Sequence, residues 1–205
     1  MKKIILVAVF AIIATVCVNA QNFGVKAGLN LASITGDETD EIDSRTSIHI
    51  GVVAEFEISD KFSFQPELLY SSQGAKYSYS EIEFNYSMEG EFKLDYLNIP
   101  LMAKYYVSEG FSIEAGPQIG ILLSAEDEWE VNFDGETDSG TDDIKDDVSS
   151  IDFGLNFGVG YKLDSGINFG ARYNLGLSNL NDDSAFDEDF KWNNSVVQIS
   201  VGYFF

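Results

Sequence analysis

The chain has 205 residues, a formal net charge of −22 and a pI near 4.1. Such an acidic protein repels the phosphate backbone, which argues against nucleic acid as a partner. Its single cysteine lies within the first twenty residues, so the rest of the chain has no thiol for a disulfide, a zinc site or a nucleophile.

Residues 1–20 have the pattern of a secretory signal peptide. Two lysines precede an apolar run, and Val18, Asn19 and Ala20 form a small-residue cleavage site. The run is shorter than the roughly 20 residues that a membrane-spanning helix needs. We therefore predict an exported mature domain that covers residues 21–205.

From residue 21 onward, apolar residues alternate with small or polar ones. Phe111, Ile113 and Ala115, for example, share one face of a segment whose other face carries Ser112 and Glu114. This period of two predicts strands, and it occurs eight times in one domain. The predicted strands are residues 23–31, 48–58, 62–70, 97–107, 111–123, 153–163, 167–177 and 197–205.

The predicted connections alternate between tight turns and long acidic loops. The turns are residues 59–61, 108–110 and 164–166, and the loops are residues 33–45, 74–92, 124–149 and 179–194. Short turns at one end and long loops at the other are typical of an up-and-down barrel. Nearly all of the excess negative charge lies in the loops.

The apolar faces indicate which side of the barrel faces outward. A soluble barrel turns its apolar face inward, whereas an outer-membrane barrel turns it toward lipid. Here the apolar faces are continuous and rich in large side chains, and the strand exteriors are left almost without charge. We therefore predict an all-β, eight-stranded antiparallel up-and-down transmembrane β-barrel in the cell outer membrane.

The chain ends on aromatic residues of its last predicted strand. Tyr203 and Phe205 resemble the signal that the outer-membrane assembly machinery reads. We expect this machinery and outer-membrane lipid as partners, and a monomeric barrel.

Several segments resemble the PorT-like outer membrane beta-barrel family of Bacteroidota. They are residues 64–70 (FQPELLY), 96–101 (YLNIPL), 115–120 (AGPQIG), 158–161 (GVGY) and 172–177 (RYNLGL). The resemblance implies an eight-stranded barrel in a Gram-negative outer membrane. It implies little about activity. The family's namesake is linked to protein secretion and gliding, but no motif in this chain transfers that role.

Six charged residues lie on the predicted inward faces, a few residues from the short-turn end. They are Lys26, Glu55, Glu67, Lys104, Glu114 and Arg172. We expect one interior ion-pair network, with Lys104 as a candidate partner of Glu67. A gate or narrow conductance is the functional alternative. A structural plug is favoured because eight strands leave room only for side chains.

Three prolines fall at similar heights on three successive predicted strands, so they cluster on one side of the barrel, with Pro66 on the lipid face. They are Pro66, Pro100 and Pro117. Because proline has no N–H to donate, we expect bulges or interrupted pairing between these strands.

The long loops carry acidic and aromatic residues that could contact other molecules. Asp134, Glu136, Asp138, Asp142 and Asp143 could offer oxygen ligands to calcium, but their spacing does not match an EF-hand. We expect a solvated loop and no metal or cofactor. The aromatic residues are candidate contacts for an extracellular protein or glycan, with the membrane-interface belt as the alternative. These residues are Trp129, Phe133, Phe186, Phe190 and Trp192.

The only histidine, His49, shares its predicted face with Ser47, but no serine-nucleophile motif surrounds them. We therefore expect a non-enzymatic structural or surface-interaction protein that acts through its acidic extracellular loops. A secretion- or transport-associated envelope factor is the alternative, and a lipid-modifying barrel enzyme is the least favoured.

Overall fold

The computed structural model describes residues 22–81, 83, 85–181 and 191–205. The predicted signal peptide and the aromatic residues Phe186 and Phe190 lie outside this part of the chain. Among the described residues, no helix is long and apolar enough to cross a membrane.

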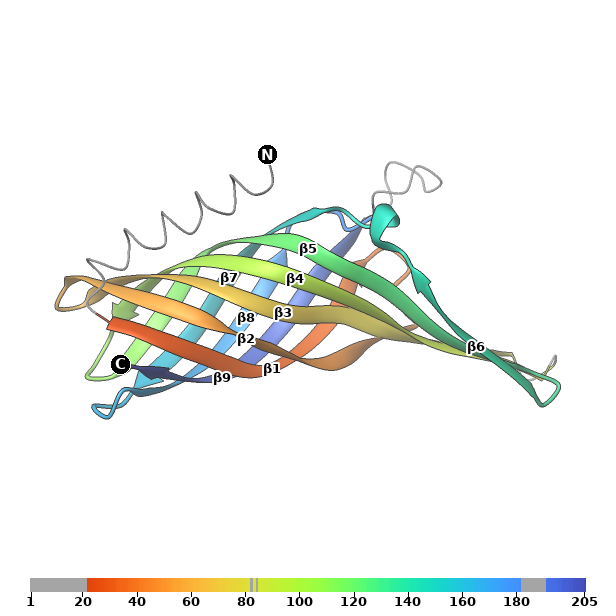
Figure 1. Ribbon diagram of the computed structural model, residues 1–205, viewed down its shortest axis with the longest axis horizontal. Helices are drawn as coiled ribbons and strands as arrows, with labels where there is room; N and C mark the ends of the chain where they lie inside the picture. Colours follow the sequence, from red (N-terminus) through yellow and green to blue (C-terminus); the bar gives the residue numbers. More distant parts are fainter. Residues whose placement is uncertain (1–21, 82, 84, 182–190) are drawn as a thin grey trace.

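Eight antiparallel strands close into a ring, as predicted (Figure 1). The elements are β1 (Asn22–Gly36), β2 (Ile42–Ser59), β3 (Phe62–Glu81), β4 (Tyr86–Tyr106), β5 (Phe111–Phe133), β6 (Glu136–Asp143), the 3-10 helix η2 (Lys145–Asp147), β7 (Ile151–Lys162), β8 (Ile167–Gly176) and β9 (Trp192–Phe204). Pairing of β1 with β9 and of β4 with β5 completes the ring. In the described part of the chain β6 pairs only with β5 and stands outside it.

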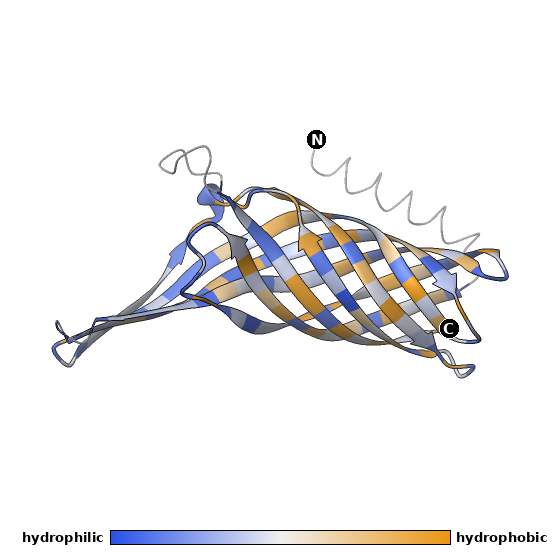
Figure 2. Ribbon diagram, turned by 180° about the vertical axis from the view of Figure 1, so that it is seen from behind, coloured by the Kyte–Doolittle hydropathy of each residue, from blue (hydrophilic) through white to orange (hydrophobic). Residues whose placement is uncertain are grey.

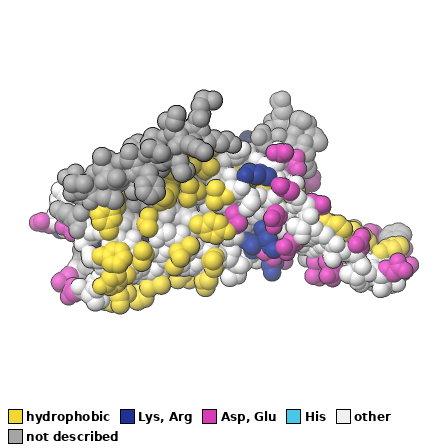
Figure 3. All heavy atoms as spheres, viewed as in Figure 1, with side chains coloured by type: hydrophobic (Ala, Val, Ile, Leu, Met, Phe, Trp, Pro, Cys, Tyr) yellow, Lys and Arg dark blue, Asp and Glu magenta, His cyan; other side chains and the backbone are white. Residues whose placement is uncertain are grey.

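The apolar faces of the ring point outward. On β1 and β2, Leu29 and Ile50 are 57% and 56% exposed, whereas their neighbours Asn30 and His49 are buried. Figure 2 shows hydrophobic and hydrophilic residues alternating along the barrel strands, and Figure 3 shows hydrophobic side chains spread over the barrel wall. An apolar exterior around a polar interior is the arrangement of a barrel that faces lipid.

Three of the strands are much longer than predicted and extend beyond the ring. Together with β6 they form a projecting four-stranded sheet, here called the blade (residues 75–81, 86–92, 127–133 and 136–142). The prediction of long loops at residues 74–92 and over most of residues 124–149 is therefore wrong. The high overall polarity of these segments favoured a loop prediction, although the Tyr, Val, Thr and Phe residues that they contain favour strands.

A bulge between β4 and β5 determines which face of the blade continues the barrel interior. Asp95 pairs with Ser124, but the next residue, Tyr96, pairs with Leu122, so Leu123 is the extra residue. Below the bulge the even-numbered residues of β5 face the barrel interior, and above it the odd-numbered residues do. The face of the blade that carries Trp129 is thus a continuation of the interior surface.

The three prolines interrupt pairing without shifting its register. Pairing of β3 with β4 stops at Pro66 and resumes at Leu69, and pairing of β4 with β5 stops at Pro100 and resumes at Ala103. Pairing of β5 with β7 passes Pro117 without a gap. The prediction of bulges or interrupted pairing is confirmed in its second form, because the pairs on either side of each gap keep the same register.

Candidate functional site

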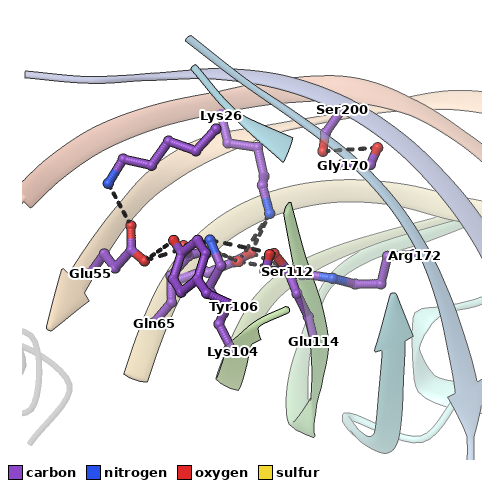
Figure 4. A network of polar contacts seen from close by, with 12 residues as sticks. Lys26, Glu55, Gln65, Lys104, Tyr106, Ser112, Glu114, Gly170, Arg172 and Ser200 are labelled. Carbon is purple, nitrogen blue, oxygen red and sulfur yellow. Dashed lines mark hydrogen bonds and ion pairs between the residues drawn. The ribbon is translucent and has the colours of Figure 1, made fainter. Parts of the chain in front are cut away.

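The barrel interior contains a layer of charged side chains near its short-turn end (Figure 4). Glu67, from β3, is at its centre and has no solvent-exposed side-chain surface. Its carboxylate accepts Lys26 Nζ at 2.9 and 3.1 Å and the two terminal nitrogens of Arg172 at 2.8 and 3.0 Å. A two-pronged guanidinium contact of this kind is both strong and directional.

The other predicted charges join this centre. Arg172 also contacts Glu114 at 3.2 Å, and Lys104 lies 3.4 Å from Glu114 and 3.7 Å from Glu55. The structure therefore brings all six predicted interior charges into one connected network, although they come from six different strands.

One partner differs from the expectation. Lys104 does not pair with Glu67, because it lies opposite Ser63 in the ladder, four residues below Glu67 toward the turn. Gln65 connects the two instead: its amide nitrogen donates to Glu67 at 2.6 Å, and its oxygen accepts from Lys104 at 3.1 Å.

Two members of the network were missed in the sequence. The hydroxyl of Tyr106 donates to Glu55, and Lys162 Nζ contacts the other oxygen of Glu55 at 2.9 Å. Lys162 Nζ also lies 4.5 Å from the centre of the Phe204 ring. The alternation of the predicted strands already places Tyr106 and Lys162 on inward faces, but both stand beside a turn. With Lys162 included, four cations face three carboxylates.

A layer of neutral polar side chains lies above the charges. Asn30 Oδ1 is 2.8 Å from His49 Nδ1, and the Asn30 amide donates to the Ser72 carbonyl at 2.7 Å. Ser47 donates to the same carbonyl at 2.6 Å. Ser47 and His49 therefore have separate partners, and the geometry lacks the hydroxyl–imidazole contact that a serine nucleophile needs.

The third layer is apolar and closes the long-loop end of the barrel. Its buried members are Ile34, Ala75, Leu94, Tyr96, Leu122, Ala125 and Leu180. On top of it is an apolar pocket of about 220 Å³, which Phe92 and Trp192 help to line.

The charged layer leaves little open space inside the described part of the barrel. A vestibule of about 710 Å³ opens at the short-turn end, but the cavity in the charged layer holds only about 20 Å³. That volume has room for about one water molecule. No residue lines both this cavity and the apolar pocket at the opposite end.

Outside the barrel, the blade carries a row of aromatic and glycine residues across its four strands. Tyr77 pairs with Gly90, Gly90 with Trp129, and Trp129 with Gly140, so all four share one face. This face continues the barrel interior and is here called the aromatic face. It bears Tyr77, Tyr79, Tyr86, Phe92, Trp129 and Phe133. The opposite face bears serine, threonine and glutamate residues together with Lys76.

Of the three described aromatics predicted as contacts, two share the blade and the third lies apart from them. Trp129 and Phe133 are on the blade, and Phe133 is 55% exposed. Trp192 is at the barrel mouth, where its Nε1 donates to the Asp37 carbonyl at 3.0 Å and its ring centre lies 6.1 Å from that of Phe92. The tyrosines of the blade were missed because residues 74–92 were predicted to be a loop.

The acidic residues considered for calcium are spread along the β5–β6 hairpin. Asp142 accepts a hydrogen bond from Trp129, while Asp138 and Asp143 accept backbone N–H groups at 3.0 Å. In the described part of the chain, no group of three or more metal-binding side chains is placed to hold an ion.

The terminal aromatics face outward at the short-turn end. Tyr203 and Phe205 are 45% and 76% exposed, and their rings make an edge contact at 5.6 Å. The Phe205 N–H donates to the Phe23 carbonyl at 2.7 Å, so the chain end is held to β1.

A closed ring of eight antiparallel strands with an apolar exterior and a filled polar interior defines the class of small outer-membrane β-barrels. The chain matches the family model described as "Outer membrane protein beta-barrel domain" over residues 19–182, and it belongs to that family. The protein is thus located in the outer membrane.

The chain is similar to several solved outer-membrane barrels. Ail, the attachment invasion locus protein of Yersinia pestis, is 11% identical with a TM-score of 0.50, over 90% of this chain and 98% of that chain. Neisserial surface protein A is 15% identical with a TM-score of 0.49, over 89% and 97%. OprG from Pseudomonas aeruginosa is 16% identical with a TM-score of 0.42, over 91% and 97%. No curated protein sequence is significantly similar to this chain.

Proposed function

We propose that this protein is a closed, non-enzymatic surface barrel that contacts other molecules through its blade. The observation that carries the proposal is the continuation of the barrel sheet into a four-stranded extension with six aromatic residues on one face. Short turns of such barrels face the periplasm and the long connections face the exterior, so the blade projects from the cell.

The filled interior favours an interaction role over transport. The charged, neutral polar and apolar layers follow one another along the barrel. The cavity in the charged layer is far too small for a solute. The secretion- or transport-associated role that the PorT-like resemblance suggests would then have to operate without a pore. An extracellular protein or glycan is the partner class, and the barrel is monomeric.

Conductance in planar bilayers tests the closed state. We expect no single-channel events from the folded protein, and steady conductance would refute a filled barrel. Glu67→Ala provides the comparison, because it removes the central carboxylate of the charged layer.

Removal of the outer blade tests the interaction role. Ala75 pairs directly with Phe92, and Asp127 with Asp142, so a two-residue Asn-Gly turn can replace residues 76–91 and another can replace residues 128–141, which removes Tyr77 and Trp129. Both forms, in nanodiscs, are then applied to immobilised panels of extracellular proteins and polysaccharides. We expect binding by the full chain only. Binding that persists in the shortened form would refute the role of the blade.

A further inference from the structure

The aromatic face of the blade combines flat aromatic rings with carboxylates. We infer that it binds a basic segment of a partner protein, rich in arginine or lysine. This inference rests on the proposed function and names the partner class. Figure 3 shows hydrophobic side chains on the projecting part of the molecule, interspersed with acidic ones.

Two rings of this face lie flat on the sheet over glycines. A Cβ atom at Gly90 would lie 2.2 Å from the Tyr77 ring, and one at Gly140 would lie 2.7 Å from the Trp129 ring. The rings thus occupy the space that side chains would otherwise fill. The sheet covers one side of each ring, and the Tyr77 ring also contacts the Phe92 ring at a centre distance of 4.9 Å. Tyr77 and Trp129 both remain partly exposed, so ring surface is left for a ligand.

Carboxylates hold both rings in place. The Tyr77 hydroxyl donates to Asp127 at 3.0 Å, and Trp129 Nε1 donates to Asp142 at 2.8 Å. Each ring is thereby fixed beside a negative charge. A cation above the ring can then interact with both the π system and the carboxylate.

Among the residues that the structure describes, no lysine or arginine forms an ion pair with either carboxylate. Asp127 and Asp142 are directly opposed in the β5–β6 ladder, where like charges destabilise a sheet. Burial, and to a lesser extent the charge of Asp142, raises the pKa of Asp127, although the hydrogen bond from Tyr77 opposes this.

Among the described residues, the ion pairs of the blade and its base involve the opposite face. Glu91 pairs with Arg45 and Lys76, and Glu128 pairs with Lys93. Among the described residues, none of these cations reaches Asp127 or Asp142. A cation from a partner would therefore relieve a repulsion that the chain itself leaves in place.

The spacing of the two rings suits an extended segment. The glycines beneath them belong to β4 and β6, two strands apart, which is roughly 10 Å at the usual strand separation. A polyproline II chain repeats every three residues over about 9 Å. A segment with a basic residue at every third position can therefore place successive cations over Tyr77 and Trp129.

Fluorescence of Trp129 tests the inference directly. The chain has two tryptophans, so Trp192→Phe leaves Trp129 as the only reporter. This full-length variant, in phosphatidylcholine nanodiscs, is titrated with the peptide (Arg-Pro-Pro)4. We expect a saturable change in emission, and no change with (Gln-Pro-Pro)4.

Matched variants separate a specific site from general attraction to an acidic blade. Asp142→Asn and Glu130→Gln each remove one negative charge from neighbouring strands, but on opposite faces. We expect Asp142→Asn and Tyr77→Leu each to weaken binding about tenfold, as for central contacts of an interface. Glu130→Gln should weaken it less than twofold. A heat-dependent gel shift verifies that each variant is folded.

Three results would overturn the inference. They are no emission change with the arginine peptide, equal weakening by Asp142→Asn and Glu130→Gln, and an equivalent saturable change with neutral maltohexaose, which would assign the face to a glycan. If the panels reveal a blade-dependent partner that is neutral or acidic, the proposed function stands and this inference fails.

Discussion

Removal of the Glu67 carboxylate should destabilise the barrel strongly. Lys26 and Arg172 are 8% and 7% exposed, and in Glu67→Ala both lose their closest anion. Breaking a buried ion pair in this way costs about 3–5 kcal/mol, because an uncompensated charge stays buried. Arg172 keeps its contact with Glu114, whereas Lys26 has no second ion pair among the described residues, so we expect a loss of about 3 kcal/mol.

The measurement is urea unfolding of the protein refolded into lipid vesicles. With a slope of about 2 kcal/mol per molar urea, a loss of this size lowers the midpoint by roughly 1.5 M. Leu68→Val, on the neighbouring half-buried position, is the control, since it removes one methylene worth about 0.8 kcal/mol or less. Equal midpoints for the two variants would refute the reasoning that the network stabilises the barrel.

Three further predictions concern the blade and the chain end. Gly140→Ala places a methyl group 2.7 Å from the Trp129 ring and should displace it, which a shift in tryptophan emission would report; an unchanged spectrum would contradict the flat packing. Asp142→Asn should lower the pKa of Asp127, because a like charge is removed while burial remains; carboxyl NMR titration measures this, and an unaltered pKa would be evidence against the repulsion. Phe205→Gln should reduce the heat-modifiable fraction found in outer membranes while leaving in-vitro unfolding unchanged; equal fractions would show that this terminal aromatic is not an assembly signal.

The period of two made the barrel predictable. Each residue of a strand points to the side opposite its neighbours, so the inward positions of Lys26, Glu67 and Arg172 followed from counting along the strands. Height above the short turns placed these charges at one level. The side of the strand and the height above the turns both depend only on local sequence, and the structure agrees with the prediction for both.

The sequence did not predict which cation pairs with which carboxylate in the charged layer. Arg172 reaches Glu67 from β8, on a strand that does not neighbour β3 in the ring. Such contacts depend on the diameter of the closed barrel and on side-chain reach. Lys104 was predicted to pair with Glu67 because the two lie on adjacent strands. In the structure Gln65 lies between them and hydrogen-bonds to both.

The sequence by itself determined the strand pattern, the outward apolar face, the inward charges and the excess of acid at one end, because alternation and composition are properties of the chain. Only the tertiary structure decided that residues 74–81, 86–92, 124–133 and 136–143 form a sheet rather than loops, since polar strands acquire their order from pairing with each other. It also decided, through the one-residue bulge at Leu123, that the aromatic rings of β5 share a face with those of β3 and β4. A single-residue shift reverses every side chain beyond it, and that shift is visible only in the register of the strands.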